Sequence, residues 1–276
     1  ALLGQGFANA VGMAMAEAHL AAVFNKPGHE IVDHYTWFIA SDGDLMEGIS
    51  HEAASFAGHN GFGKLIGFYD DNRITIDGST DLSYSDDARK RFEGYGWQVL
   101  RLDDVNDLAA IDQVIAQAKA DKERPTLVIT RTHIGYGSPK KQDTASAHGE
   151  PLGKDEVVAT KKNLGWPWPE EAFRVPDEVL AHTRKAVEKG RAARAEWQKR
   201  FASFPERDEL QRRIEGRLPA NWDAKIPTFT KENGNVASRA ASNVALNAIA
   251  PVLPELIGGS ADLTPSNGSA LKGHPV

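Results

Sequence analysis

Residues 34–43 read HYTWFIASDG, an apolar run that ends in a turn. Its first seven residues are aromatic, β-branched or otherwise apolar, which is typical of a strand buried on both faces, and Ser41-Asp42-Gly43 ends the run with turn-forming residues. A second stretch of the same kind, Leu65-Ile66-Gly67-Phe68-Tyr69, ends at Asp70-Asp71-Asn72. Because strands without polar alternation belong to parallel sheets, the two stretches predict neighbouring strands of an α/β fold.

Helical patterns alternate with further strand patterns around this pair. Small and apolar residues recur at helical spacing over 5–24, 46–58 and 107–120, and short apolar runs at 96–100 and 125–130 predict two more strands. Strands that alternate with helices at short intervals predict a parallel sheet covered by helices on both faces.

The second half of the chain has a different character. Residues 135–176 are rich in Gly, Pro, Lys and Ser and predict a long ordered loop, whereas 177–215 are charged and helical without a strong apolar stripe. A helix at 237–249 and a strand at 255–259 predict the opening of a second α/β domain. We therefore expect three parts, which are an α/β domain at 1–150, a loop and helical linker at 151–228, and an incomplete α/β domain at 229–276.

Composition excludes several classes of protein. The 276 residues carry 32 Lys and Arg against 38 Asp and Glu, a formal charge of −6, and 41% are hydrophobic, which is enough for a core and argues against a dedicated nucleic-acid binder. The absence of Cys excludes disulfides and thiolate chemistry. The apolar pattern predicts no run of the roughly 20 residues that a membrane span needs, so we expect no membrane partner. The chain opens inside the motif Ala1-Leu2-Leu3-Gly4-Gln5-Gly6, without Met or a signal pattern, and we expect it to be part of a longer protein.

Polar residues at the ends of the first two strands carry the candidate chemistry. Asp42 follows one strand and Asn72 follows the other, thirty residues later. In open α/β sheets ligands bind beyond the carboxyl ends of the strands, and carboxylate, amide and main-chain oxygens suit Mg²⁺ or Ca²⁺. Gly43 permits close approach of a phosphate, and Gly4-Gln5-Gly6 opens a helix whose free N–H groups favour an anion. Together they predict a metal–diphosphate site, although each motif alone also fits a simple turn.

Longer motifs around these residues resemble one enzyme family. Asp42-Gly43 followed by Asn72 resembles the thiamine-diphosphate signature. The flanking sequences are similar to transketolase nearly from end to end, in the segments 42–52 (DGDLMEGISHE), 68–78 (FYDDNRITIDG), 91–97 (RFEGYGW), 134–139 (IGYGSP), 148–153 (HGEPLG), 237–239 (ASR) and 258–267 (GGSADLTPSN).

This resemblance implies roles for individual residues. Asp42, Asn72 and the carbonyl of Ile74 would hold the metal, and His148 would contact cofactor and substrate and take part in proton transfer. Thiamine diphosphate would be bound by Leu3, Gly43, Asn72, His148 and Asp262. Arg239 and Ser266 would bind the sugar phosphate together with His148, and Glu47 and Glu52 would be acids at the subunit interface.

The resemblance also implies an activity. A transketolase transfers a two-carbon ketol unit from a ketose phosphate to an aldose phosphate in the pentose phosphate pathway, using thiamine diphosphate and a divalent metal. It implies a cytoplasmic homodimer, or a partner chain that completes the site, because the family's catalytic Glu would lie downstream of Val276. Ala1-Leu2 and Ser41 depart from the family's usual Gly-Pro and Gly. Two alternatives stay open, which are a subunit of a split transketolase and a non-catalytic diphosphate-binding dimerisation module.

Overall fold

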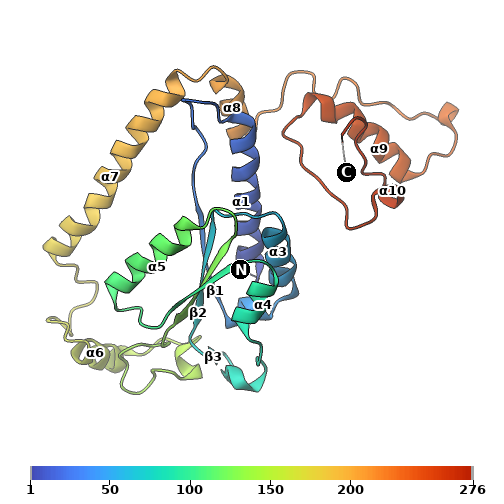
Figure 1. The fold of residues 1–276 in the computed structure, drawn as a ribbon. Helices are drawn as coiled ribbons and strands as arrows, with labels where there is room; N and C mark the ends of the chain where they lie inside the picture. The colour runs from blue at the N-terminus through green and yellow to red at the C-terminus, as the bar shows by residue number, and fades with distance from the viewer. Residues whose placement is uncertain (1, 275–276) are drawn as a thin grey trace. The chain divides into compact units, whose positions relative to one another are not determined.

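The structure is a computed structural model that describes residues 2–274. The chain divides into two compact units, Ala1–Arg200 and Phe201–Val276 (Figure 1). The predicted three-part division of the sequence stays a prediction.

The first unit is built on a parallel sheet. In the described part of the chain its strands stand in the order β1 (Thr36–Ser41), β2 (Leu65–Asp71), β6 (Thr126–Arg131) and β5 (Gln98–Leu102), and every neighbouring pair is parallel. The register pairs Ser41 with Asp70, so β1 and β2 end at the same edge of the sheet. The residues that follow them, Asp42 and Asn72, are therefore delivered to that edge, as the sequence predicts.

Helices pack on both faces of the sheet (Figure 1). On one face α1 (Gln5–Phe24), α3 (Gly48–His59) and α4 (Ala88–Gly94) enclose the main core, in which Phe7, Phe38 and Trp97 are buried. On the other face α5 (Leu108–Ala120) packs over β5 and β6 through Val114. The α/β prediction is confirmed, but α5 leaves Ile39 on β1 80% exposed.

Helix α1 corrects one expectation from the sequence. Among residues 2–274 it is the helix that is long and apolar enough, by length and composition, to cross a membrane, with a mean hydropathy of 1.3. The apolar length of this helix is not evident from the sequence pattern, because small residues, mainly Ala, make up much of it. In this structure Phe7, Val11 and Ala14 of α1 pack into the main core.

Local structure departs from the sequence prediction in several places. The helix expected at 46–58 is α3 (Gly48–His59), and it begins two residues later than expected because a separate short helix, α2 (Asp42–Met46), precedes it and ends at Glu47. The expected loop at 135–176 contains a helix, α6 (Lys154–Asn163), which is so highly charged that its apolar pattern is weak. The sequence also did not predict α4 or the short hairpin of β3 (Ile74–Thr75) and β4 (Gly78–Ser79).

The charged helical stretch is confirmed as α7 (Asp177–Ala202) and α8 (Arg207–Ile214). Beyond it, α9 (Ser238–Ile249) matches its prediction and α10 (Thr264–Asn267) is a single turn. The strand predicted at 255–259 is wrong, since those residues are irregular. No other segment among the described residues of the second unit is a strand, so an extended run there has no ladder to join.

Candidate functional site

Asp42 is a buried carboxylate with one unused oxygen. It begins α2 directly after β1 and is 2% exposed. The Tyr69 hydroxyl on β2 donates a short hydrogen bond to Asp42 Oδ1, whereas Oδ2 is buried without a partner. Burial raises the pKa of Asp42, and the Tyr69 hydrogen bond opposes that shift. A buried carboxylate oxygen without a partner is costly, and a bound cation would satisfy it.

The loop after β2 brings the second set of oxygens to Asp42. Buried Asn72 accepts a hydrogen bond at Oδ1 from the main-chain N–H of Ile74 at 2.8 Å. Arg73 between them has φ 63°, a left-handed conformation that folds the loop back on itself. Helix α2 contacts β3, and the Arg73 main-chain amide lies close enough to lower the pKa of Asp42.

This donor set fits the predicted metal. It offers one carboxylate, one side-chain amide and the main-chain carbonyl of Ile74, which are hard oxygen ligands for Mg²⁺ or Ca²⁺. Residues 2–274 contain no group of three or more His, Asp or Glu arranged to hold a metal ion. With so few protein ligands, phosphate oxygens or water would have to complete the coordination shell.

Leu3 and Gly43 lie against each other. A Cβ placed on Gly43 would stand 3.3 Å from Leu3 Cδ1, so the two predicted cofactor residues are direct neighbours. Gly4 next to them has φ 75°, and a Cβ there would meet Ile49 and Ser50 at 2.8 Å. The chain therefore needs glycine at position 4 for both its conformation and its space.

Asp44 ties this loop to the end of β1. Its Oδ1 accepts from the Gly4 N–H at 2.9 Å, and its Oδ2 accepts from the Ser41 N–H at 3.0 Å. The Ser41 hydroxyl also points to Asp44 Oδ2, at 3.4 Å. The departure from glycine at position 41 is thus accommodated by Asp44. The spacing Ser41-x-x-Asp44 is a capping-box pattern, and this sequence signal marks Asp44 as a residue that binds main-chain amides.

His148 is exposed on the long loop between β6 and α6. A Cβ on the adjacent Gly149 would lie 3.8 Å from Ile76 Cδ1, so this loop runs beside the turn that joins β3 to β4. Buried Glu156 fixes the start of the loop by accepting from Ser138 Oγ at 2.6 Å and from the Lys140 N–H at 2.8 Å. His148 therefore belongs to the neighbourhood of the Asn72–Ile74 loop.

Glu47 and Glu52 are exposed, with Glu47 at the junction of α2 and α3. Glu47 and the exposed apolar residue Ile49 both lie against Gly4, and the neighbouring Leu3 and Met46 are exposed as well. The predicted place of Glu47 and Glu52 at a subunit interface stays a prediction.

The remaining predicted residues belong to the second unit. Arg239 on α9 donates from Nη1 to the carbonyl of Ser266 on α10 at 3.4 Å, so the two predicted phosphate-binding residues are neighbours. Asp262 is exposed and has φ 57°.

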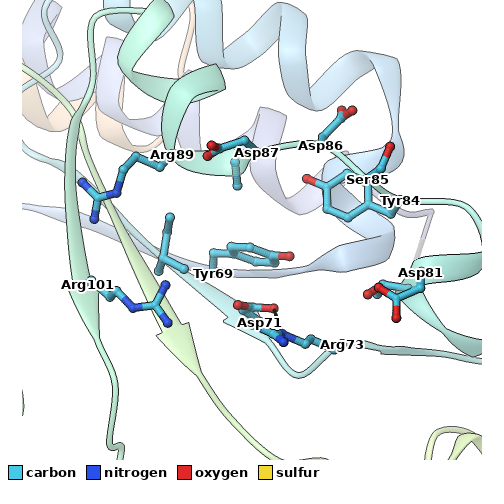
Figure 2. A pocket seen from close by; sticks show the side chains of 13 residues that line it. Tyr69, Asp71, Arg73, Asp81, Tyr84, Ser85, Asp86, Asp87, Arg89 and Arg101 are labelled. Atoms are coloured by element: carbon cyan, nitrogen blue, oxygen red, sulfur yellow. Dashed lines mark ion pairs between the residues drawn. The ribbon is translucent and has the colours of Figure 1, made fainter.

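Two cavities open on opposite faces of the sheet, because successive residues of β2 point to opposite sides. The larger, about 500 Å³, has Tyr69 and Asp71 in its wall, and Figure 2 shows them between Arg89 and Arg101 on one side and Tyr84 on the other. The second, about 420 Å³, is lined by Phe68, Asp70 and Asn72 together with Thr130 of β6 and residues that follow that strand. Of the predicted site residues, Asn72 lines the second cavity, and Leu3, Gly43 and His148 line neither.

Tyr69 is the functional candidate that sequence reasoning missed. It reads as one more apolar residue of a buried strand, and only the fold shows that its hydroxyl reaches Asp42. No sequence pattern marks that contact.

Comparison with known proteins agrees with this geometry. Residues 1–219 match the family model for the thiamine diphosphate binding domain of transketolase. The chain is 53% identical to a transketolase of Nostoc over 277 positions and 49% identical to chloroplastic transketolase-1 of Arabidopsis thaliana over 276, in each case over 98% of this chain. It spans 41% and 37% of the length of these two relatives.

Solved structures give the same result. A transketolase from Pichia stipitis in complex with sedoheptulose-7-phosphate matches with a TM-score of 0.94 at 44% identity, covering 99% of this chain and 41% of that one. The transketolase of Leishmania mexicana matches with a TM-score of 0.93 at 41% identity, covering 98% of this chain and 40% of that one. The family model covers well over half of the chain, and the relatives agree with it along nearly all of it. The chain belongs to the transketolase family.

Proposed function

We propose that the protein is a transketolase, in which this chain supplies the metal and diphosphate part of the cofactor site. The observation that carries the proposal is the buried Asp42 with its unpartnered Oδ2, beside the Asn72–Ile74 loop. We propose that the metal is Mg²⁺ or Ca²⁺, held by Asp42, Asn72 and the Ile74 carbonyl.

The chain's own residues would bind and orient the cofactor. Gly43 has no Cβ, so a phosphate oxygen could approach its main chain, and Leu3 lies beside it. Asn72, one of the proposed metal ligands, also lines the second cavity. Thiamine diphosphate, when bound, supplies the nucleophilic carbon of the reaction. The protein's contribution here is placement and charge neutralisation.

Substrate handling would involve three further residues. Exposed His148, on the loop beside the β3–β4 turn, would contact the substrate and move a proton. Arg239 offers a planar guanidinium for a sugar phosphate, and its neighbour Ser266 offers a hydroxyl. The ketose phosphates bound in the Pichia stipitis structures indicate the substrate class.

A second copy of the protein is the proposed partner. Leu3, Met46 and Ile49 are 39–54% exposed beside Glu47, and apolar side chains grouped in this way are typical of a surface that a partner covers. Glu47 and Glu52 would then lie between the two copies. Sedimentation of the full-length protein tests this, and a monomer at micromolar concentration contradicts it.

Ketol transfer by the full-length protein tests the activity. We expect transfer from a ketose phosphate to an aldose phosphate with thiamine diphosphate and Mg²⁺, loss of activity in EDTA, and recovery with Mg²⁺ or Ca²⁺. Cofactor binding measured in parallel separates the alternatives. Binding without transfer favours the dimerisation module, transfer only after a second polypeptide is added favours the split enzyme, and neither binding nor transfer contradicts the proposal.

A further inference from the structure

Asp44 is held between two segments that the proposed function places at the cofactor. One carboxylate oxygen accepts from the Gly4 N–H at 2.9 Å and the other from the Ser41 N–H at 3.0 Å. These donors are 40 and 3 residues away in sequence, so a single side chain bridges a loop and a strand end. A side chain that accepts one hydrogen bond at each oxygen, from two different segments, holds those segments at a fixed separation.

The main chain of Asp44 is fixed as well. Fully buried Ser50 on α3 donates from Oγ to the Asp44 carbonyl at 2.6 Å. The next carbonyl, that of Leu45, is 2.6 Å from His51 Nε2. Helix α2 has only five residues, so these contacts with α3, rather than its own hydrogen bonds, keep Asp44 in place.

The bridge fixes the separation of Leu3 and Gly43. Leu3 directly precedes Gly4, whose N–H is one of the two bridged groups. Gly43 lies between Ser41, which carries the other bridged N–H, and Asp44 itself. Leu3 Cδ1 stands 3.3 Å from the position of a Cβ on Gly43, so a small shift of either segment would close or open the space between them. A site for a diphosphate tolerates little such movement.

We propose that Asp44 is a positioning residue that locks the Leu3–Gly4 loop against the Ser41–Gly43 turn and so presets the diphosphate site. The inference rests on the proposed function, because it takes Leu3 and Gly43 as cofactor residues. Asp44 touches neither metal nor cofactor in this account and acts through the two main-chain amides that it holds.

The test compares Asp44→Ala and Asp44→Asn with the wild type in the full-length protein. Asparagine keeps one acceptor oxygen but turns an N–H₂ group toward the other amide, so it should retain part of the bridge. Asp112→Asn, an exposed position on α5, is the matched control for the loss of one carboxylate. The measurements are the Kd of thiamine diphosphate at saturating Mg²⁺, kcat at saturating cofactor, and the melting temperature without cofactor.

We expect Asp44→Ala to raise the Kd of thiamine diphosphate by about 10–100-fold, the range typical when a group that orients ligating residues is removed. Asp44→Asn should fall between it and the wild type, with kcat little changed in both and Asp112→Asn like the wild type. If Asp44→Ala fails to fold, Asp44→Asn carries the test alone. A lower melting temperature with an unchanged Kd would show a purely structural role and overturn the inference. Failure of the wild type itself to bind the cofactor would instead contradict the proposed function.

Discussion

Tyr69 and Tyr84 offer a matched pair of perturbations around one cavity (Figure 2). The Tyr69 hydroxyl donates to Asp42, whereas the buried Tyr84 hydroxyl has no partner. Changing either residue to Phe removes one oxygen atom and leaves the ring. The two variants therefore have the same composition and differ in whether Asp42 loses a donor.

The two substitutions should have different effects: Tyr69→Phe should weaken metal binding, whereas Tyr84→Phe should leave the stability of the fold unchanged or raise it. A hydrogen bond to a charged group contributes about 1.5–3 kcal/mol, so Tyr69→Phe should leave Asp42 free to turn and weaken the metal site by that amount. At 1.4 kcal/mol per tenfold change this corresponds to about 10–100-fold in metal affinity, the range found for removal of groups that orient metal ligands. Tyr84→Phe removes a hydroxyl that is buried without a partner, and we expect stability to be unchanged or raised by up to about 1 kcal/mol.

Calorimetric titration of Ca²⁺ into the full-length protein with saturating thiamine diphosphate measures the metal affinity, and denaturant unfolding in EDTA measures the stability of the metal-free fold. We expect metal affinity to fall in Tyr69→Phe only. Equal affinities in Tyr69→Phe and the wild type, or an equal loss in Tyr84→Phe, would refute the reasoning that Tyr69 orients a metal ligand.

Two predictions concern the fold. A Cβ on Gly67 would lie 2.1 Å from the Phe38 ring, which already packs against Phe7 at 4.6 Å between ring centroids. Gly67→Ala should therefore lower the free energy of unfolding by about 1–3 kcal/mol. An unchanged denaturation midpoint would mean that Phe38 moves aside. Hydrogen bonding from Arg212 holds the pKa of Glu209 at about 2, below its usual 4.5, so its contribution to stability is present above pH 4.5 and is lost as the pH falls toward 2. Unfolding of Glu209→Gln measured from pH 6 to pH 2 should depend less on pH than that of the wild type, and identical profiles would contradict this assignment.

The sequence predicts the elements whose apolar pattern is long. Helix α1, strands β1, β2 and β6 and helix α5 match because each has an apolar run in the sequence that is long enough to indicate its type. Short or highly charged elements escape, since α4 has seven residues, β3 and β4 have two each, and α6 reads KDEVVATKKN. The run at 255–259 fails for the opposite reason, because an apolar pattern makes a strand only where a neighbour can pair with it.

The candidate site also contains residues that the sequence predicts and residues that it does not. Asp42 and Asn72 were found because strand ends gather at one edge of a parallel sheet, a rule that needs only element order. Tyr69 and Asp44 act through contacts that depend on register and on the path of a loop. Periodicity carries neither kind of information, although the capping-box spacing marks Asp44 as a residue that binds main-chain amides.

Asp42 is the residue on which the account depends most, and its isosteric variant Asp42→Asn provides the most direct test. Thiamine diphosphate is titrated into full-length wild type, Asp42→Asn and the control Asp112→Asn, each with Mg²⁺ and with EDTA. The account predicts binding that requires Mg²⁺ in the wild type and the control, and no gain from Mg²⁺ in Asp42→Asn. Binding by Asp42→Asn that Mg²⁺ strengthens as much as in the wild type would contradict the assignment of the metal site.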